Sequence, residues 1–295
     1  MIFRIGHFSD LHLGPLPSGA AFKSFRAKRL IGTLSWHMNR KSKHSAEVAE
    51  ALRQDILAAE LDHIAFTGDA TNVASPLEFP KLRNWMDSLA TPEQLSYTPG
   101  NHDAYVPVAH EQGLKFFAPF MSGDMRDSPE FPFVRLRRNI ALIGLNSAIP
   151  RFWHSAQGRL GLAQRERLRL RLTELKAKGF YRVVMIHHPP APGLATHLRS
   201  LIDAKEVAQI LNDQQVELVI HGHNHQRELH WLKTGHRPVP IIGVPSASMG
   251  AQTHHPAEWN CYDISRLSGQ WQTEVTIRRW NGIAFEQATA FRLEA

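Results

Sequence analysis

Two kinds of hydrophobic pattern alternate along most of the chain: short, mainly apolar runs, and longer segments with apolar residues three or four positions apart. The short runs are typical of buried β-strands, and the longer spacing is typical of helices with one buried face. Strands are therefore predicted at residues 2–8, 63–67, 95–98, 140–145, 182–187 and 216–220, and helices at 47–60, 78–90, 162–178 and about 203–212. The alternation of strands and helices predicts an α/β fold.

The pattern changes after residue 238 and becomes rich in β-forming residues. Strands are predicted at 270–279 and 283–292, joined across Asn281-Gly282, a dipeptide typical of tight hairpin turns. The chain has no repeat and no Pro/Gly/Ser linker, so we expect one α/β domain over 1–295, with two layers of sheet between helices. The β-rich section at about 256–295 is expected to belong to this domain, as an added lobe or an oligomer contact.

Composition narrows the class of protein. Hydrophobic residues make up 43% and charged residues 21% of the 295, which excludes a disordered chain. No apolar run reaches the roughly 18 residues of a membrane-spanning helix, and residues 1–10 lack the long apolar stretch of a secretory signal. The single cysteine, Cys261, excludes an internal disulfide and a thiolate zinc cluster. We therefore expect a cytoplasmic protein.

The positive charge is confined to one early segment. Residues 11–46 contain seven Lys and Arg and no acidic residue, which leaves 27 Lys and Arg against 27 Asp and Glu elsewhere. A basic insertion or cap is predicted at about 18–46, most simply as two short helices broken near Gly32. Its charges are either solvated or, through residues 20–44, contact an anionic membrane surface on the inner face. Nucleic acid fits the charge alone, without a supporting aromatic stacking motif.

Histidine and aspartate residues gather where the predicted strands end. The five segments are Asp10-Leu11-His12, Gly68-Asp69, Gly100-Asn101-His102-Asp103, His187-His188 and His221-Gly222-His223-Asn224-His225. In open α/β sheets, ligands bind at the carboxyl ends of strands, so these loops are expected to converge. If the segments are extended, residues two apart, such as Asp10 and His12, face the same side. Imidazole, carboxylate and amide ligands without thiolate favour Mn, Fe, Zn, Co or Ni over Ca.

Any one of these segments alone is also compatible with a turn or a capping loop. Their order and spacing, taken together, resemble the calcineurin-like metallophosphoesterase superfamily over residues 2 to about 250. The resemblance implies a four-layer αββα double β-sandwich and a centre of two metal ions, of Mn, Fe, Zn or Co. It implies that Asp69 bridges both ions, and that the first histidine of the His-x-Pro stretch, His187, is a ligand. Carried over, Asp10, His12 and His225 hold one ion, and Asn101, His187 and His223 hold the other.

Two-metal chemistry suggests roles for the neighbouring residues. A hydroxide that bridges the ions is expected to attack phosphorus in line. His102 is a candidate to protonate the leaving alkoxide or bind a phosphate oxygen, with Asp103 fixing its tautomer; a structural role is the alternative. Further candidates to contact substrate are His188, His221, Arg151 and His154. The alternatives for these four are partners of the metal ligands and residues of a solvated loop.

The sequence thus predicts a metal-dependent phosphodiester hydrolase, with two competing substrates. The leading hypothesis is a phospholipid or other amphiphilic phosphodiester at the membrane surface, as in phospholipase C-like members of the superfamily. The alternative is a soluble cyclic nucleotide, because the Gly-Asn-His-Asp form is similar to that of bacterial cyclic-nucleotide phosphodiesterases. A nucleotide-lipid pyrophosphatase is less favoured, since that group typically has arginine where this chain has His102. A non-catalytic scaffold is disfavoured because every expected ligand is present.

Overall fold

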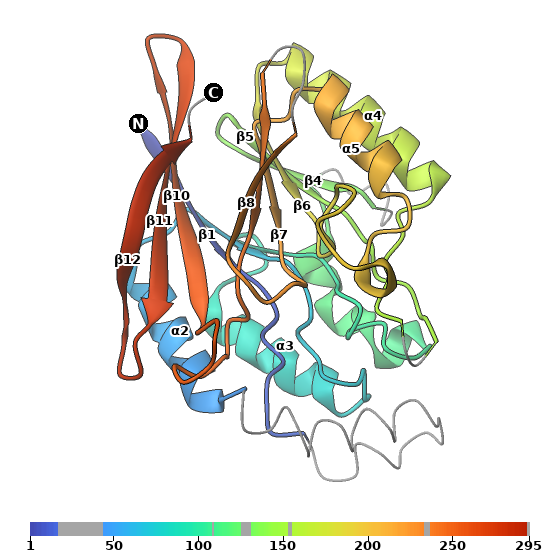
Figure 1. Cartoon of the computed structure of the whole chain (residues 1–295), viewed down its shortest axis with the longest axis vertical. Coiled ribbons are helices and arrows are strands. Elements are labelled where there is room, and N and C mark those ends of the chain that lie inside the picture. Colours follow the sequence, from blue (N-terminus) through green and yellow to red (C-terminus); the bar gives the residue numbers. More distant parts are fainter. Residues whose placement is uncertain (17–43, 108, 125–130, 153–154, 233–236, 294–295) are drawn as a thin grey trace.

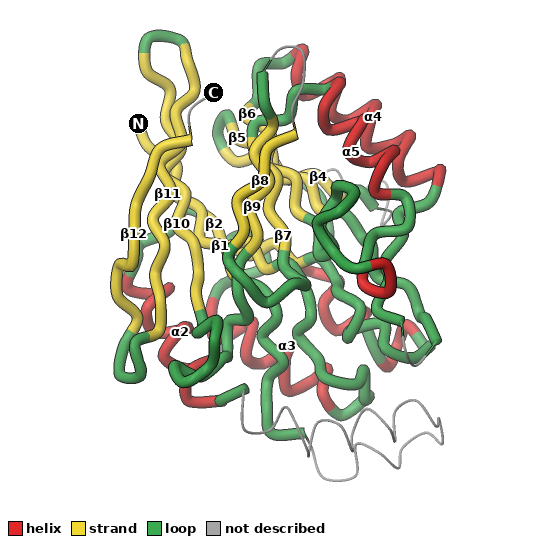
Figure 2. Tube along the Cα trace, viewed as in Figure 1, coloured by secondary structure: helices red, strands yellow, loops and turns green. Residues whose placement is uncertain are grey.

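The computed structural model describes residues 1–16, 44–107, 109–124, 131–152, 155–232 and 237–293. Its twelve strands form two six-stranded sheets that face one another (Figure 1; Figure 2). The first sheet has the order β12-β11-β10-β1-β2-β3. Its strands are β1 (Ile2–Phe8), β2 (His63–Phe66), β3 (Leu95–Tyr97), β10 (Glu258–Leu267), β11 (Gln270–Trp280) and β12 (Phe285–Leu293).

The second sheet has the order β4-β5-β6-β7-β9-β8. Its strands are β4 (Phe133–Arg137), β5 (Ile140–Gly144), β6 (Tyr181–Met185), β7 (Leu218–His221), β8 (Glu228–Leu232) and β9 (Val239–Gly243). The α-helices are α2 (Ala46–Ala58), α3 (Glu78–Leu89), α4 (Leu162–Ala177) and α5 (Ala204–Asp213). Short 3₁₀ helices are η2 (His110–Gln112), η3 (Leu114–Met121) and η4 (His197–Arg199).

Alternate side chains of each strand point to different layers of the molecule. In β6, Val183 and Met185 pack between the two sheets, while Val184 packs against α4 and α5. In β1, Ile5 packs between the sheets, and Phe8 packs against α2 and α3. Strands that are buried on both faces read as continuous apolar runs. The expected four-layer αββα arrangement is therefore confirmed.

The direction of the strands decides where the loops meet. β1, β2 and β3 run parallel, and so do β5, β6, β7 and β9. Their carboxyl ends therefore lie along one edge of the sandwich. β10, β11 and β12 pair antiparallel and continue the first sheet beside β1, so the alternative of an added lobe is wrong for these strands. The predicted hairpin across Asn281-Gly282 is confirmed.

All ten predicted elements before residue 238 are present, with ends that shift by one or two residues. Strands β4, β8, β9 and β10 are additional to those the pattern predicts. β4 lacks an apolar pattern because it carries Arg135, which is buried and donates to the main-chain carbonyls of Ser122, Leu95 and others. The basic insertion predicted at 18–46, and the membrane contact through residues 20–44, lie outside the described residues except for 44–46.

None of the described helices is long and apolar enough to cross a membrane.

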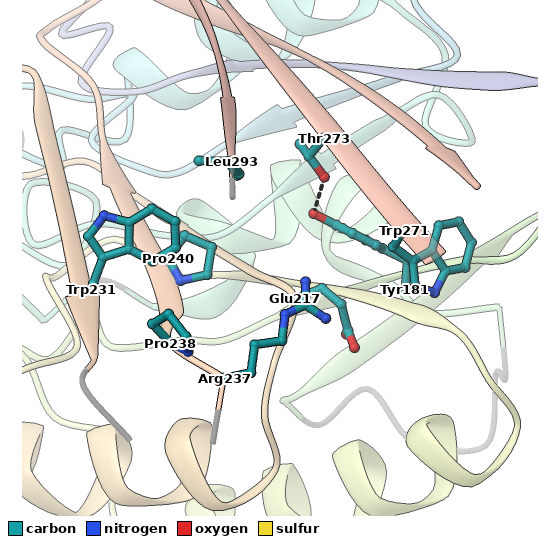
Figure 3. Close-up of a pocket in the computed structure, with 9 residues that line it drawn as sticks. All are labelled: Tyr181, Glu217, Trp231, Arg237, Pro238, Pro240, Trp271, Thr273 and Leu293. Carbon is teal, nitrogen blue, oxygen red and sulfur yellow. Dashed lines mark hydrogen bonds between the residues drawn. The ribbon is translucent and has the colours of Figure 1, made fainter. Parts of the chain in front are cut away.

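At the edge opposite the carboxyl ends of the parallel strands, the two sheets enclose a small pocket beside the start of β6 (Figure 3). Its lining includes Trp231, Arg237 and Trp271, and the Tyr181 hydroxyl lies 2.6 Å from Thr273 Oγ1. A hydrogen bond thus joins the two sheets at this end.

Arg182 stabilises the same end of the second sheet. Its guanidinium is buried, with Nε 2.8 Å from Oε2 and Nη2 2.9 Å from Oε1 of Glu217. It also donates to the main-chain carbonyls of Gln214 and Gln215, at 2.9 and 2.7 Å. Removing one partner of a buried ion pair leaves the other partner without its hydrogen bonds, and this strongly destabilises the folded state.

We therefore expect Arg182→Met to lower the free energy of unfolding by about 3–5 kcal/mol, measured by urea denaturation. Arg169→Met is the matched control, because Arg169 pairs with Glu166 on the exposed face of α4; its loss should stay below about 1 kcal/mol. Similar losses in the two variants would contradict the importance of the buried pair.

Candidate metal centre

All seven side chains predicted as metal ligands meet at the carboxyl ends of the parallel strands. Asp10 and His12 follow β1, Asp69 follows β2, Asn101 follows β3, His187 follows β6, and His223 and His225 follow β7. Six of the seven are buried, and the side chain of His225 is 27% exposed. Five loops distant in the sequence thus place three kinds of metal-binding group in one small volume.

Five of the seven proposed ligands have left-handed backbone, so the expectation of extended segments is wrong at these residues. Positive φ angles occur at Asp10 (54°), His12 (42°), Asp69 (54°), His223 (71°) and His225 (56°). Non-glycine residues rarely adopt this region, and each instance costs of the order of 1 kcal/mol or more. Main-chain hydrogen bonds between the loops hold it in place, from Asp10 N to Gly68 O at 2.9 Å and from His12 N to Asp69 O at 3.0 Å.

Two glycines let the aspartates approach the backbone. A Cβ atom on Gly100 would lie 2.2 Å from Asp69 Oδ1, and one on Gly222 would lie 2.4 Å from Asp10 Oδ2. Atoms that are not bonded to each other do not approach this closely, so a side chain at either position would displace the aspartate. The glycines of the two motifs are therefore needed for close packing.

One half of the centre is built around Asp10 and two histidines. Asp10 Oδ1 lies 3.0 Å from His225 Nε2, and His12 Nε2 lies 3.4 Å from His225 Nε2. Asp69 Oδ2 lies 3.8 Å from His12 Nε2. Adjacent ligands of one ion with bonds of about 2.1 Å are expected about 3 Å apart. Asp10 Oδ1 is buried without a hydrogen-bond partner, which fits an oxygen that faces a cation.

The other half is built around His187. Its Nε2 atom lies 3.2 Å from Asn101 Oδ1, 3.2 Å from His223 Nδ1 and 3.3 Å from Asp69 Oδ2. Asp69 Oδ2 therefore faces both halves. The donor set of the two halves together, which is imidazole, carboxylate and amide oxygen, fits transition-metal ions.

Main-chain carbonyls select the tautomer of the histidines. Nδ1 of His12 donates to Thr71 O at 3.1 Å, and Nδ1 of His187 donates to Thr67 O at 2.7 Å. In the neutral form of each ring this leaves the lone pair on Nε2, which faces the centre. His223 is reversed, because its Nε2 donates to Arg199 O at 2.8 Å and its Nδ1 faces the centre. A histidine whose outer N–H is held in this way is oriented for metal binding.

The pKa values of the histidines at the centre follow from burial and from the two carboxylates. Burial, together with neighbouring imidazoles, holds the pKa values of His12 and His223 well below the ordinary value. Burial also acts to lower the pKa of His187, but Asp69 and Asp10 outweigh it and raise this pKa to about 9. Metal ions bind neutral imidazole, so loading this half of the centre requires release of the proton on His187.

His102 lies at the edge of the centre. A ring nitrogen of His102 is within 4.8 Å of a ring nitrogen of His12 and an oxygen of Asp69. Its Nδ1 donates to Asn72 O at 2.5 Å, and its ring stacks on Tyr105 with the centroids 5.4 Å apart. The carbonyl of Asn72 therefore fixes its tautomer, and the expectation that Asp103 does so is wrong.

Asp103 instead holds the loops together. Its carboxylate accepts hydrogen bonds from Asp69 N at 3.0 Å, Thr71 N at 2.9 Å, Gly100 N at 2.8 Å and the hydroxyl of Tyr97 at 2.5 Å. It is buried, and burial followed by the charge of Asp69 raises its pKa to about 6. Asp103 is a structural residue that positions Asp69.

Two of the predicted substrate-binding histidines do not line the centre. His188 is buried with both ring nitrogens engaged, Nδ1 with Ser147 Oγ at 2.7 Å and Nε2 with Ala156 O at 3.0 Å. His221 is buried, its Nδ1 lies 3.0 Å from Gly222 O, and its Nε2 faces Glu228 at 3.7 Å. Both are packed within the fold, which favours the alternative of partners to the metal ligands, and their expected contact with substrate stays a prediction.

The remaining two candidates come from the loop after β5. Arg151 Nη2 donates to Gln157 Oε1 at 2.7 Å, so its guanidinium lies against its own loop. His154 lies outside the described residues. A role for either in substrate binding stays a prediction.

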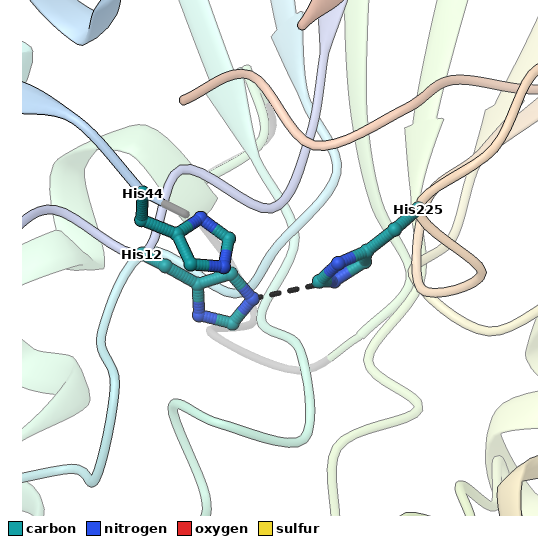
Figure 4. A group of neighbouring side chains, drawn as sticks. All are labelled: His12, His44 and His225. Carbon is teal, nitrogen blue, oxygen red and sulfur yellow. Dashed lines mark hydrogen bonds between the residues drawn. The ribbon is translucent and has the colours of Figure 1, made fainter. Parts of the chain in front are cut away.

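The structure adds one histidine that the sequence pattern missed. His44 lies beside His12 and His225, and a ring nitrogen of each is within 4.8 Å of the other two (Figure 4). It lies near the end of the basic segment, two residues before α2, and therefore outside the pattern of residues that follow strands. Its only sequence signal is its place just before Ser45, which caps α2.

We expect Asp103→Asn to destabilise the protein by about 2–4 kcal/mol, because an amide cannot accept hydrogen bonds from all four donors. Tyr97→Phe removes one donor and should cost less, about 1–2 kcal/mol. Thermal or urea unfolding of both variants is the measurement. An Asp103→Asn variant of unchanged stability would argue against the structural role. It would instead favour a role for Asp103 in the proton transfer by His102.

The chain has relatives among known proteins. The sequence model of the calcineurin-like phosphoesterase family matches residues 3–227. A probable cyclic nucleotide phosphodiesterase of Synechococcus sp. is 28% identical over 218 residues, which are 72% of this chain and 76% of that protein. A crystal structure of a dimetal phosphatase from Danio rerio has a TM-score of 0.65 at 14% identity, covering 97% of this chain and 98% of that one.

The fold recurs in a larger protein as well. Purple acid phosphatase PPD1 from yellow lupin seeds has a TM-score of 0.62 at 12% identity, and the match covers 99% of this chain and 53% of that one. At these identities the solved structures support the fold alone. The family match spans most of the chain and includes both halves of the centre, so this chain belongs to the calcineurin-like phosphoesterase family and is a metal-dependent phosphoesterase.

Proposed function

We propose that the protein hydrolyses phosphodiesters with two metal ions. One ion would be held by Asp10, His12 and His225, and the other by Asn101, His187 and His223, while Asp69 contacts both. When bound, two such ions supply positive charge for phosphate oxygens and lower the pKa of a coordinated water molecule. The observation that carries the proposal is the meeting of nitrogen and oxygen atoms 3.0–3.8 Å apart in each half.

The donor set limits which ions fit. The seven side chains provide four imidazoles, two carboxylates and one amide oxygen, without a thiolate. Imidazole suits Zn, Fe and Co, while carboxylate oxygen also suits Mn. Two carboxylates balance only part of the charge of two divalent ions. The remaining positive charge would favour an anionic substrate.

His102 is proposed to act on the leaving group. Because Nδ1 donates to Asn72 O, a proton that His102 exchanges with substrate would be the one on Nε2. Its position beside His12 and Asp69, in the loop after β3, supports this role. Stacking on Tyr105 keeps the ring from rotating away.

Two observations bear on the substrate. The relative from Synechococcus is named a probable cyclic nucleotide phosphodiesterase, and this supports a cyclic nucleotide as the first substrate to test. The sequence-based preference for an amphiphilic phosphodiester depends on the seven cations of residues 11–46, and this charge keeps a lipid as the second candidate. Both substrates are phosphodiesters, so the chemistry of the centre is common to them.

The proposal is tested with a panel of diesters after chelation and add-back of Mn²⁺, Fe²⁺, Co²⁺ or Zn²⁺. The panel contains bis-p-nitrophenyl phosphate, cyclic AMP, cyclic GMP and phospholipid vesicles, with Asp69→Ala as the inactive control. We expect metal-dependent hydrolysis of the soluble diesters, including a cyclic nucleotide. Turnover of vesicle lipid alone would favour the second candidate, and no turnover with any metal would contradict the proposal.

For His102→Ala we expect turnover of a diester with a poor, alkoxide leaving group to fall by about 100-fold or more, since that group needs a proton. The loss of turnover on bis-p-nitrophenyl phosphate should be smaller, because p-nitrophenolate leaves without being protonated. Metal content should stay at the wild-type value. The exposed His110, replaced by alanine, is the control and should change neither rate. Equal losses on both substrates would indicate phosphate binding rather than proton transfer.

A further inference from the structure

His44 is held firmly at the rim of the centre. Its backbone pairs with Met249 in an antiparallel bridge, and the next residue, Ser45, donates its N–H to Ser248 O at 2.9 Å. The Ser45 hydroxyl then accepts hydrogen bonds from the first N–H groups of α2. The helix on one side and the loop after β9 on the other therefore fix the Cα position of His44.

The ring of His44 is oriented by hydroxyl groups of the same loop. The side chain is buried, and Nδ1 lies 2.8 Å from the hydroxyl of Ser248 and 3.4 Å from that of Ser246. The Ser246 hydroxyl donates to Asp10 O at 2.6 Å. The loop that orients His44 thus also supports the backbone of Asp10.

The imidazole of His44 packs against two of the proposed ligands (Figure 4). Its ring centroid lies 4.8 Å from that of His12, in an edge-to-face arrangement, and 6.0 Å from that of His225. The first of these distances resembles the 5.1 Å between the rings of His187 and His223, which face the other half. The rings of His44 and His12 are therefore spaced like the rings of two proposed ligands in the other half.

We infer that His44 is a further protein ligand of the ion proposed to lie among Asp10, His12 and His225. The inference rests on the proposed function. The nitrogens of the three imidazoles are within 4.8 Å of one another, while opposite ligands of a six-coordinate ion with bonds of about 2.1 Å are about 4.2 Å apart.

A third imidazole makes the two halves chemically different. The half with His44 would offer three imidazoles, whereas the half with Asn101 offers two and an amide oxygen. More nitrogen ligands favour Fe²⁺, Co²⁺ or Zn²⁺ over Mn²⁺. The ion beside His44 would therefore be the more tightly bound and the more selective of the two.

The test measures metal binding directly and does not use activity. Full-length protein is stripped with a chelator and titrated with Co²⁺ against a competing chelator, and the visible absorption of the bound ion is recorded. For His44→Ala we expect one of the two ions to bind about 10-fold or more weakly, with a changed Co²⁺ spectrum, while the other ion binds as before. Preference for Co²⁺ over Mn²⁺ at the weakened half should also fall.

His63→Ala is the matched control. His63 is buried and its ring pairs with a serine hydroxyl at 2.8 Å, as in His44, but it begins β2 at the end opposite the centre. We expect both of its ions to bind as in the wild type. His44→Asn guards against misfolding, since its amide retains hydrogen-bonding capacity near Ser248 yet is too short to reach the ion; it should behave like His44→Ala.

The outcomes separate this inference from the proposed function. Two ions bound with wild-type affinity and an unchanged spectrum in folded His44→Ala and His44→Asn would overturn the ligand role of His44 alone. Failure of the wild-type protein to bind two ions would overturn both proposals. Equal weakening in His63→Ala would show a general packing effect and would also overturn the inference.

Discussion

The carboxylate of Asp69 must face two half-sites at once, and the surrounding loops are arranged to hold it there. Its Oδ2 lies 3.3 Å from His187 Nε2 and 3.8 Å from His12 Nε2, while Oδ1 accepts a hydrogen bond from His102 N at 2.7 Å. Its own N–H is fixed by Asp103. Because one oxygen is used by the protein, the other is directed between the halves, and the geometry of both depends on it.

Burial makes this arrangement costly in the absence of cations. Imidazoles and carboxylates packed this closely leave no room for water between them. Groups of like charge therefore repel one another, and each charge loses the hydration it would have in solvent. The proton that Asp69 and Asp10 retain on His187 is one result. Left-handed backbone at five of the seven proposed ligands adds strain. Binding of cations would relieve the electrostatic cost, so metal binding and folding stability should be linked.

The sequence predicts the features of the centre that follow from strand direction. It does not predict those that depend on the orientation of individual side chains. Apolar runs located the strands, and parallel strands bring their carboxyl ends together, so Asp10 and His187 could be placed. Which face a loop residue adopts is decided by local backbone angles and tertiary contacts, so His188 was assigned to the pocket although it packs inward. His44 was missed because its position depends on pairing with Met249, over 200 residues away.

The hydrogen bonds that set which nitrogen of His12, His102, His187 and His223 faces the centre end on peptide carbonyls. These are the carbonyls of Thr71, Asn72, Thr67 and Arg199. A peptide carbonyl is present whatever side chain its residue carries. Point mutation at those four positions therefore leaves the proton arrangement of the centre intact, provided the loop keeps its shape. His44 differs, because its ring is oriented by the hydroxyl of Ser248. Over evolutionary time, a single substitution at Ser248 can therefore remove the group that orients the ring of His44.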